Sequence, residues 1–84
     1  MADDMDGNMG FIMGNKQRER VIQILGSKGK MAADKVAKVE HIPAPTVHKI
    51  LAEMAEKNLV AENDGTWSLT DDGMAIEKEM KKRG

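Results

Sequence analysis

Eight basic side chains lie within residues 15–49, and they make this segment the part of the 84-residue chain most suited to binding a charged ligand. The segment holds only three acidic residues, whereas residues 1–14 and 50–84 each carry a net charge of −3. A basic segment between acidic ones favours an anionic partner such as nucleic acid. Uneven charge is also common on solvated protein surfaces, so that alternative stays open at this point.

Metal binding and covalent catalysis find little support among the side chains. The chain has no cysteine, which excludes disulfides, thiolate zinc sites and cysteine nucleophiles. His41 and His48 are separated by seven positions, with no further soft ligand nearby, and do not match a zinc-site spacing. Ser27 and Ser68 are explained by turn and strand positions, so no catalytic triad is indicated. We therefore expect no enzymatic activity, no metal and no cofactor.

The length and composition indicate one small folded domain. The hydrophobic fraction of 40% and the charged fraction of 32% suit a folded soluble protein. No apolar run approaches the ~18 residues of a membrane span. The N-terminus is acidic, which is the wrong charge for a signal peptide. These features predict a cytoplasmic protein without a membrane segment.

Three predicted helices must position the basic side chains. The first runs over residues 15–26, from the N-cap Asn15 to Gly26, and the second over residues 33–38. The third runs over residues 44–57, with Pro45 in its first turn. Its apolar positions repeat at helical spacing and should face the core; they are Val47, Ile50, Leu51 and Met54.

A β-hairpin and a fourth helix are predicted after these three helices. The strands cover residues 59–62 and 66–69, with 63–65 as the loop between them. Thr70 should cap the last helix, whose best inward positions are Ile76 and Met80. We expect residues 1–14 to form a flexible acidic leader, because three glycines argue against a stable helix there. The apolar residues 11–13 leave open that the end of the leader folds back onto the domain. Residues 15–84 would form the folded domain.

Three segments of the chain resemble prokaryotic winged helix-turn-helix transcriptional regulators. Residues 43–51 (PAPTVHKIL) resemble the start of a recognition helix, and residues 54–60 (MAEKNLV) resemble the exit into the wing. Residues 67–73 (WSLTDDG) resemble the segment that closes the wing in MarR-like regulators. The resemblance implies a mainly α fold with a small β-hairpin, in the order α-α-α-β-β-α, with room for a short strand before the second helix.

The resemblance further implies a DNA-binding regulator whose partner is double-stranded DNA. Helix 44–57 would enter the major groove, because a helix fits that groove and its N-terminal residues come closest to the bases. The expected base-facing residues are Thr46, His48, Lys49, Pro45 and Ala44. Neighbouring basic side chains would bind phosphates, and they are Lys28, Lys30, Lys35, Lys38, Lys16 and Arg18.

Other interpretations stay open for these residues. The outer side of helix 44–57 could be an ordinary solvated face, and winged helices also serve as protein–protein interaction modules, which the acidic wing would suit. Trp67 favours core packing over stacking. Domains that bind left-handed nucleic acid also carry a tryptophan in the second wing strand, although Ala52 stands where they have a tyrosine. Symmetric operators favour a homodimer, here through helix 71–83 and the leader.

Overall fold

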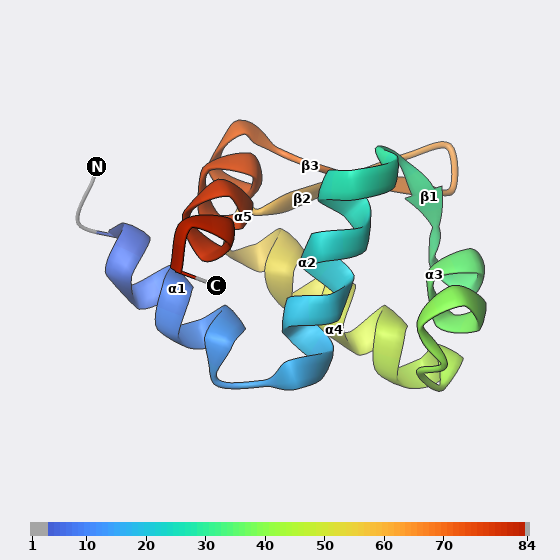
Figure 1. Ribbon diagram of the computed structural model, residues 1–84. Helices are drawn as coiled ribbons and strands as arrows, with labels where there is room; N and C mark the ends of the chain where they lie inside the picture. The colour runs from blue at the N-terminus through green and yellow to red at the C-terminus, as the bar shows by residue number, and fades with distance from the viewer. Residues whose placement is uncertain (1–3, 84) are drawn as a thin grey trace.

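The computed structural model describes residues 4–83, with side chains described for residues 7–82. Residues 1–3 of the predicted leader and Gly84 lie outside the described residues. The described chain forms five helices and three short strands around one core (Figure 1). They are α1 (Asp4–Met13), α2 (Lys16–Lys28), β1 (Met31–Ala32), α3 (Ala33–Glu40), α4 (Ala44–Glu56), β2 (Val60–Asn63), β3 (Thr66–Leu69) and α5 (Asp71–Arg83). The predicted order is confirmed, with α1 in addition.

Helix α2 begins where the sequence predicts and ends later. The Asn15 side chain accepts hydrogen bonds from the backbone N–H groups of Gln17 at 2.8 Å and Arg18 at 3.1 Å. The helix passes through Gly26 and stops at Gly29, whose φ is +82° and whose N–H still bonds the carbonyl of Leu25 at 3.0 Å. The predicted end at Gly26 is therefore wrong, because Gly29 adopts the positive φ that ends the helix.

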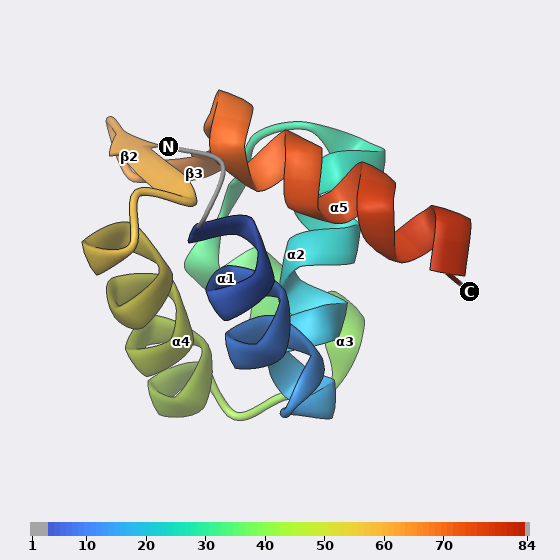
Figure 2. The same cartoon turned by 90° about the vertical axis from the view of Figure 1, so that its left-hand side faces the viewer.

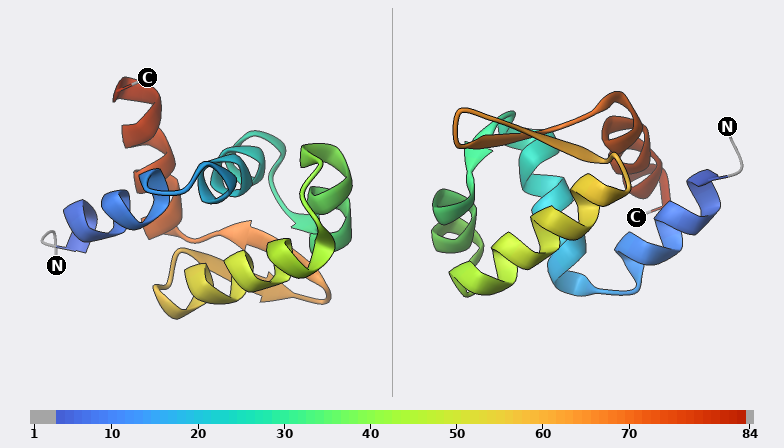
Figure 3. Two further views of the ribbon diagram at one scale, coloured as in Figure 1. Left: turned by 90° about the horizontal axis from the view of Figure 1, so that it is seen from below. Right: turned by 180° about the vertical axis from the view of Figure 1, so that it is seen from behind.

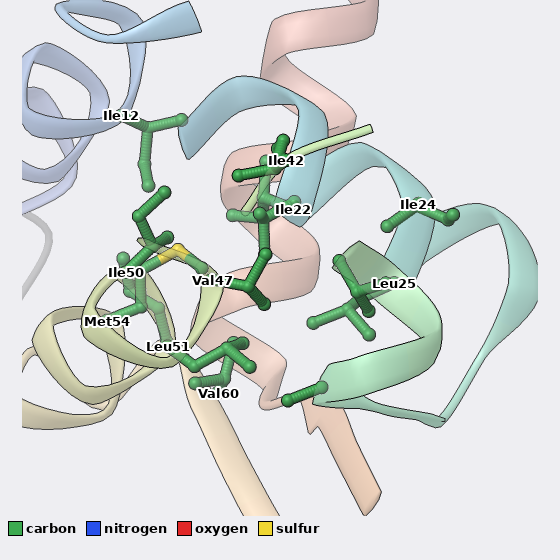
Figure 4. Close-up of a cluster of buried hydrophobic side chains, with 14 of the residues drawn as sticks. Ile12, Ile22, Ile24, Leu25, Ile42, Val47, Ile50, Leu51, Met54 and Val60 are labelled. Carbon is green, nitrogen blue, oxygen red and sulfur yellow. The ribbon is translucent and has the colours of Figure 1, made fainter. Parts of the chain in front are cut away.

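Helices α3 and α4 pack on each other and join through a tight turn at His41, whose φ is +57°. Helix α4 ends at Glu56, one residue before the predicted Lys57, while α3 continues to Glu40 rather than stopping at Lys38. The apolar stripe predicted for α4 is buried as expected (Figure 4). These residues are Val47, Ile50, Leu51 and Met54.

The three strands form an antiparallel sheet in the order β1-β3-β2. Strand β1 is the short strand for which the sequence leaves room before the second helix. The wing turn is shorter than the predicted loop 63–65, because Asn63 pairs with Thr66 and only Asp64 and Gly65 lie between the strands. Both turn residues have positive φ, 52° and 83°, as two-residue hairpin turns of this kind require.

Helix α1 corrects the expectation that residues 1–14 form a flexible leader without a stable helix. Met9 is 3% exposed and Ile12 is fully buried, so α1 contributes side chains to the common core. Gly7 and Gly10 are exposed and have no neighbouring atom near the site of a Cβ. Burial of the opposite apolar face offsets the low helix propensity of these glycines. Figure 2 shows α1 beside α2, on which it packs, and α1 also contacts α5.

Helix α5 begins at the predicted cap and closes the core. The backbone N–H of Gly73 donates to Thr70 Oγ1 at 3.1 Å, and the Thr70 hydroxyl donates to the carbonyl of Asn58 at 2.6 Å. Ile76 and Met80 are buried, as expected. None of the described helices combines the length and apolarity needed to cross a membrane.

Candidate nucleic-acid interface

The predicted base-facing residues lie on the outer side of α4. Pro45, His48 and Lys49 are exposed, Thr46 is partly exposed, and Ala44 is partly buried against the core. Their positions follow from the helical period, because burial of the Val47–Met54 stripe turns the remaining positions outward. Seen from behind, α4 runs across the molecule without another element in front of it (Figure 3).

The N-terminal half of α4 forms a shallow hollow with the start of α2. The hollow has a volume of about 210 Å³. It is lined from α4 by Thr46, Lys49, Ile50 and Glu53, and on the other side by the N-cap Asn15 and by Gln17 and Arg18 of α2. Among the described side chains, Lys49 has no ion-pair partner. A free ammonium group on an exposed helix face can donate to base acceptors or to phosphates.

Arg18 is engaged inside the protein rather than extended towards solvent. Its Nη2 donates to Glu53 Oε1 at 3.2 Å, and its Nη1 donates to the backbone carbonyl of Phe11 at 3.1 Å. The guanidinium also lies 4.0 Å from the centre of the Phe11 ring. Arg18 therefore joins α1, α2 and α4, and these contacts leave it poorly placed for the phosphate contact that the sequence indicates.

His48 lies beside two acidic side chains that no sequence pattern indicates, Asp34 and Glu62. Its Nε2 is 3.6 Å from Asp34 Oδ1, and the two side chains are 58% and 87% exposed. Both line a hollow of about 390 Å³ with Glu62 and Trp67 of the wing. The attraction operates only when His48 is protonated, and an exposed pair of this kind is weak. No spacing signal in the sequence links Asp34 to His48, because the turn between α3 and α4 brings them together.

The remaining lysines predicted to bind phosphate are exposed, and none has an ion-pair partner among the side chains described. Lys35 and Lys38 lie on α3, which packs on α4. Lys16 lies at the end of α2 that forms the hollow with α4, whereas Lys28 and Lys30 lie at its opposite end, next to β1 (Figure 1). Lys35 and Lys38 thus lie on the helix that packs on α4, and Lys16 lies in the first turn of α2, beside the residues that line the hollow.

Trp67 is partly buried and packs against the hydrophobic core, so the packing interpretation is confirmed. In the sheet, it lies opposite Met31 of β1 and Glu62 of β2. Within residues 4–83, no group of three histidine, aspartate or glutamate side chains lies close enough together to hold a metal ion.

Comparison with solved structures supports the fold. No protein-family model matches the chain, and no curated protein matches it. The structure of ligand-free NadR superposes with a TM-score of 0.79 and 20% sequence identity, over 98% of this chain and 65% of NadR. The MarR family protein Rv2887 of Mycobacterium tuberculosis superposes with a TM-score of 0.77 and 14% sequence identity, over 89% of this chain and 58% of Rv2887. ZitR of Lactococcus lactis superposes with a TM-score of 0.71 and 26% sequence identity, over 98% of this chain and 70% of ZitR.

The chain thus spans less than two thirds of the length of NadR and of Rv2887. At this level of identity the superpositions establish the fold, because winged helices of one shape carry different functions. The resemblance to MarR-like regulators that the sequence indicates is confirmed at the level of the fold, and the chain is a winged helix of the type found in the MarR family protein Rv2887.

Proposed function

We propose that this chain is a DNA-binding domain of a transcriptional regulator and that it acts by inserting α4 into the major groove. The observation that carries the proposal is the exposed outer face of α4, with Lys49 unpaired among the described side chains. The MarR family assignment of Rv2887, whose fold this chain shares, adds support. The proposed activity is binding, with no catalytic step.

The proposed contacts divide into two kinds. Thr46, His48 and Lys49 would approach base edges, with Pro45 and Ala44 beside them at the start of α4. Lys16, Lys35 and Lys38 would bind phosphates and so orient the domain without reading sequence. Lys28 and Lys30 lie at the other end of α2, next to β1, and would bind the outer backbone of a bound duplex.

Lys49→Ala is expected to weaken binding to the preferred site by about 1–3 kcal/mol and to reduce selectivity, because a base-edge donor is lost. Lys35→Ala serves as the matched control, since it should weaken binding to all sequences alike and flatten the dependence of affinity on salt. Fluorescence anisotropy titrations at several salt concentrations would measure both effects. Equal affinities for the parent and both variants would contradict the α4 mechanism.

An NMR titration with random-sequence duplex DNA at low salt tests the function directly. Amide shifts should change first along the N-terminal half of α4 and along α3, because these segments carry the proposed contacts. Shift changes confined to the face of α5 would exclude the proposed orientation. An absence of shift changes at millimolar duplex would exclude DNA binding itself.

A protein-interaction module is the second candidate, and the hollow beside His48 favours it. Asp34 and Glu62 make this hollow acidic, which repels phosphates and suits a basic peptide segment. The two candidates differ in their charge requirement, because the DNA mechanism depends on Lys49 and the peptide mechanism depends on Asp34 and Glu62. The NMR titration described above, repeated with a lysine-rich peptide, would separate them.

We further propose a homodimer formed through α5 and the N-terminal segment. Met13 on α1 and Met74 on α5 are 42% and 53% exposed, which leaves apolar surface on both proposed elements. Sedimentation at micromolar concentration should give twice the 9.2 kDa mass of one chain. A monomer under these conditions would remove this proposal without affecting the fold.

A further inference from the structure

We infer that Arg18 is a positioning residue for DNA recognition, because it holds the Glu53 carboxylate and so leaves Lys49 free to bind. The inference rests on the proposed function. It assigns to Arg18 an indirect role through Lys49, in place of the direct phosphate contact that the sequence indicates.

Lys49 and Glu53 are the two charged groups that α4 itself would pair. They are four positions apart on one helix, and side chains at this spacing are neighbours on the helix surface. Both line the hollow between α4 and the start of α2. A Lys49–Glu53 pair would neutralise the ammonium group that the proposed mechanism needs, and it would place a carboxylate near the DNA phosphates.

In the structure the Glu53 carboxylate pairs with Arg18 and not with Lys49. Glu53 Oε1 lies 3.2 Å from Arg18 Nη2, while Lys49 has no ion-pair partner among the described side chains. The Arg18 and Glu53 side chains are 24% and 32% exposed, so their pair is less screened by solvent and salt than a pair on the open helix face. The planar guanidinium can also bind two acceptors at once, which an ammonium group cannot do with the same geometry.

Two contacts from α1 fix the guanidinium in this position. The carbonyl of Phe11 accepts a hydrogen bond from Arg18 Nη1 at 3.1 Å, and the Phe11 ring lies 4.0 Å from the guanidinium carbon. The Lys57 ammonium group, at the end of α4, lies 4.8 Å from the centre of the same ring. Phe11 thus connects α1 to the charged surface of α4, and the docking of α1 determines which partner Glu53 takes.

Arg18→Gln is expected to weaken duplex binding by about two- to fivefold, which is the range that an exposed ion pair involving Lys49 would cost. The decisive comparison uses Lys49→Gln as the background. In that background Arg18→Gln should not lower duplex affinity further, because the lysine through which Arg18 acts is absent. An equal loss in both backgrounds would overturn the inference and identify Arg18 as a direct phosphate contact.

Glu53→Gln provides the rescue and Glu56→Gln the matched control. Affinity should return to within about twofold of the parent in Arg18→Gln/Glu53→Gln, because no carboxylate then competes for Lys49. The double variant Arg18→Gln/Glu56→Gln has the same net charge as Arg18→Gln/Glu53→Gln. Its duplex affinity should stay as low as that of Arg18→Gln, because Glu56 lies two helical turns from Lys49. If both double variants recovered duplex affinity equally, net charge alone would explain the recovery, and the inference would be overturned.

A measurement without DNA separates this inference from the proposed function. The side-chain carboxyl ¹³C shift of Glu53 should respond to Lys49→Gln only when Arg18 is replaced by glutamine. If Arg18→Gln is poorly folded, Arg18→Met offers the same test, because it removes the charge and keeps a long side chain that can pack as the arginine stem does. A response to Lys49→Gln in the parent protein would show that Glu53 already contacts Lys49, and it would overturn the inference whether or not DNA binds.

Discussion

Gly73→Ala is expected to destabilise the protein by about 3 kcal/mol, at the upper end of the cost of overpacking. A Cβ at this position would overlap the backbone carbonyl oxygen of Leu59 and would lie 3.1 Å from the carbonyl carbon and 3.3 Å from Leu69 Cβ. The Leu59 oxygen also accepts a hydrogen bond from the Thr70 N–H at 3.0 Å. Because the obstacle is backbone, no side-chain rotation can relieve the overlap, and the start of α5 must move away from β2.

Gly10→Ala is the matched control for this prediction. Gly10 is also helical, but it is exposed, and apart from its own chain neighbours and the nearby backbone of α1 no atom lies within 4 Å of the site of its Cβ. Alanine there should stabilise the protein by about 0.5–1 kcal/mol through the smaller entropy of the unfolded chain. Urea unfolding followed by circular dichroism would measure both variants. A Gly73→Ala protein as stable as the parent would show that the contact between α5 and Leu59 is looser than described.

Ile12→Ala is expected to destabilise the protein by about 2–5 kcal/mol, because it removes a fully buried side chain from the core. The prediction tests whether α1 belongs to the cooperative fold, since Ile12 and Met9 are the buried side chains that α1 supplies among those described. The loss should also release Phe11 from Arg18, so duplex affinity should fall in the direction expected for Arg18→Gln.

Met13→Ala is the control for Ile12→Ala, because Met13 is the next residue of α1 and 42% of its surface is exposed. Its effect on the unfolding free energy, measured at a concentration where the chain is monomeric, should stay within about 0.5 kcal/mol, as for surface substitutions generally. Equal effects of the two variants, measured by urea unfolding, would indicate that α1 does not dock on the core in solution.

The sequence alone determined the elements whose signals are local. The apolar stripe of α4 follows from a helical period within one segment, and both predicted caps follow from single polar residues, Asn15 and Thr70. Gly65 correctly indicated the wing turn, although the loop was predicted one residue too long. The outward position of His48 and Lys49 followed from the same period that buried the stripe.

Only the tertiary structure decided the features that depend on distant segments. Helix α1 forms because Ile12 is buried by other elements, against a local preference set by its glycines. Arg18 and Glu53 are 35 residues apart, and no spacing rule in the sequence joins them. The charge that α4 presents to a partner therefore depends on which side chains the fold brings together, because an ion pair forms between neighbours in space whatever their separation along the chain.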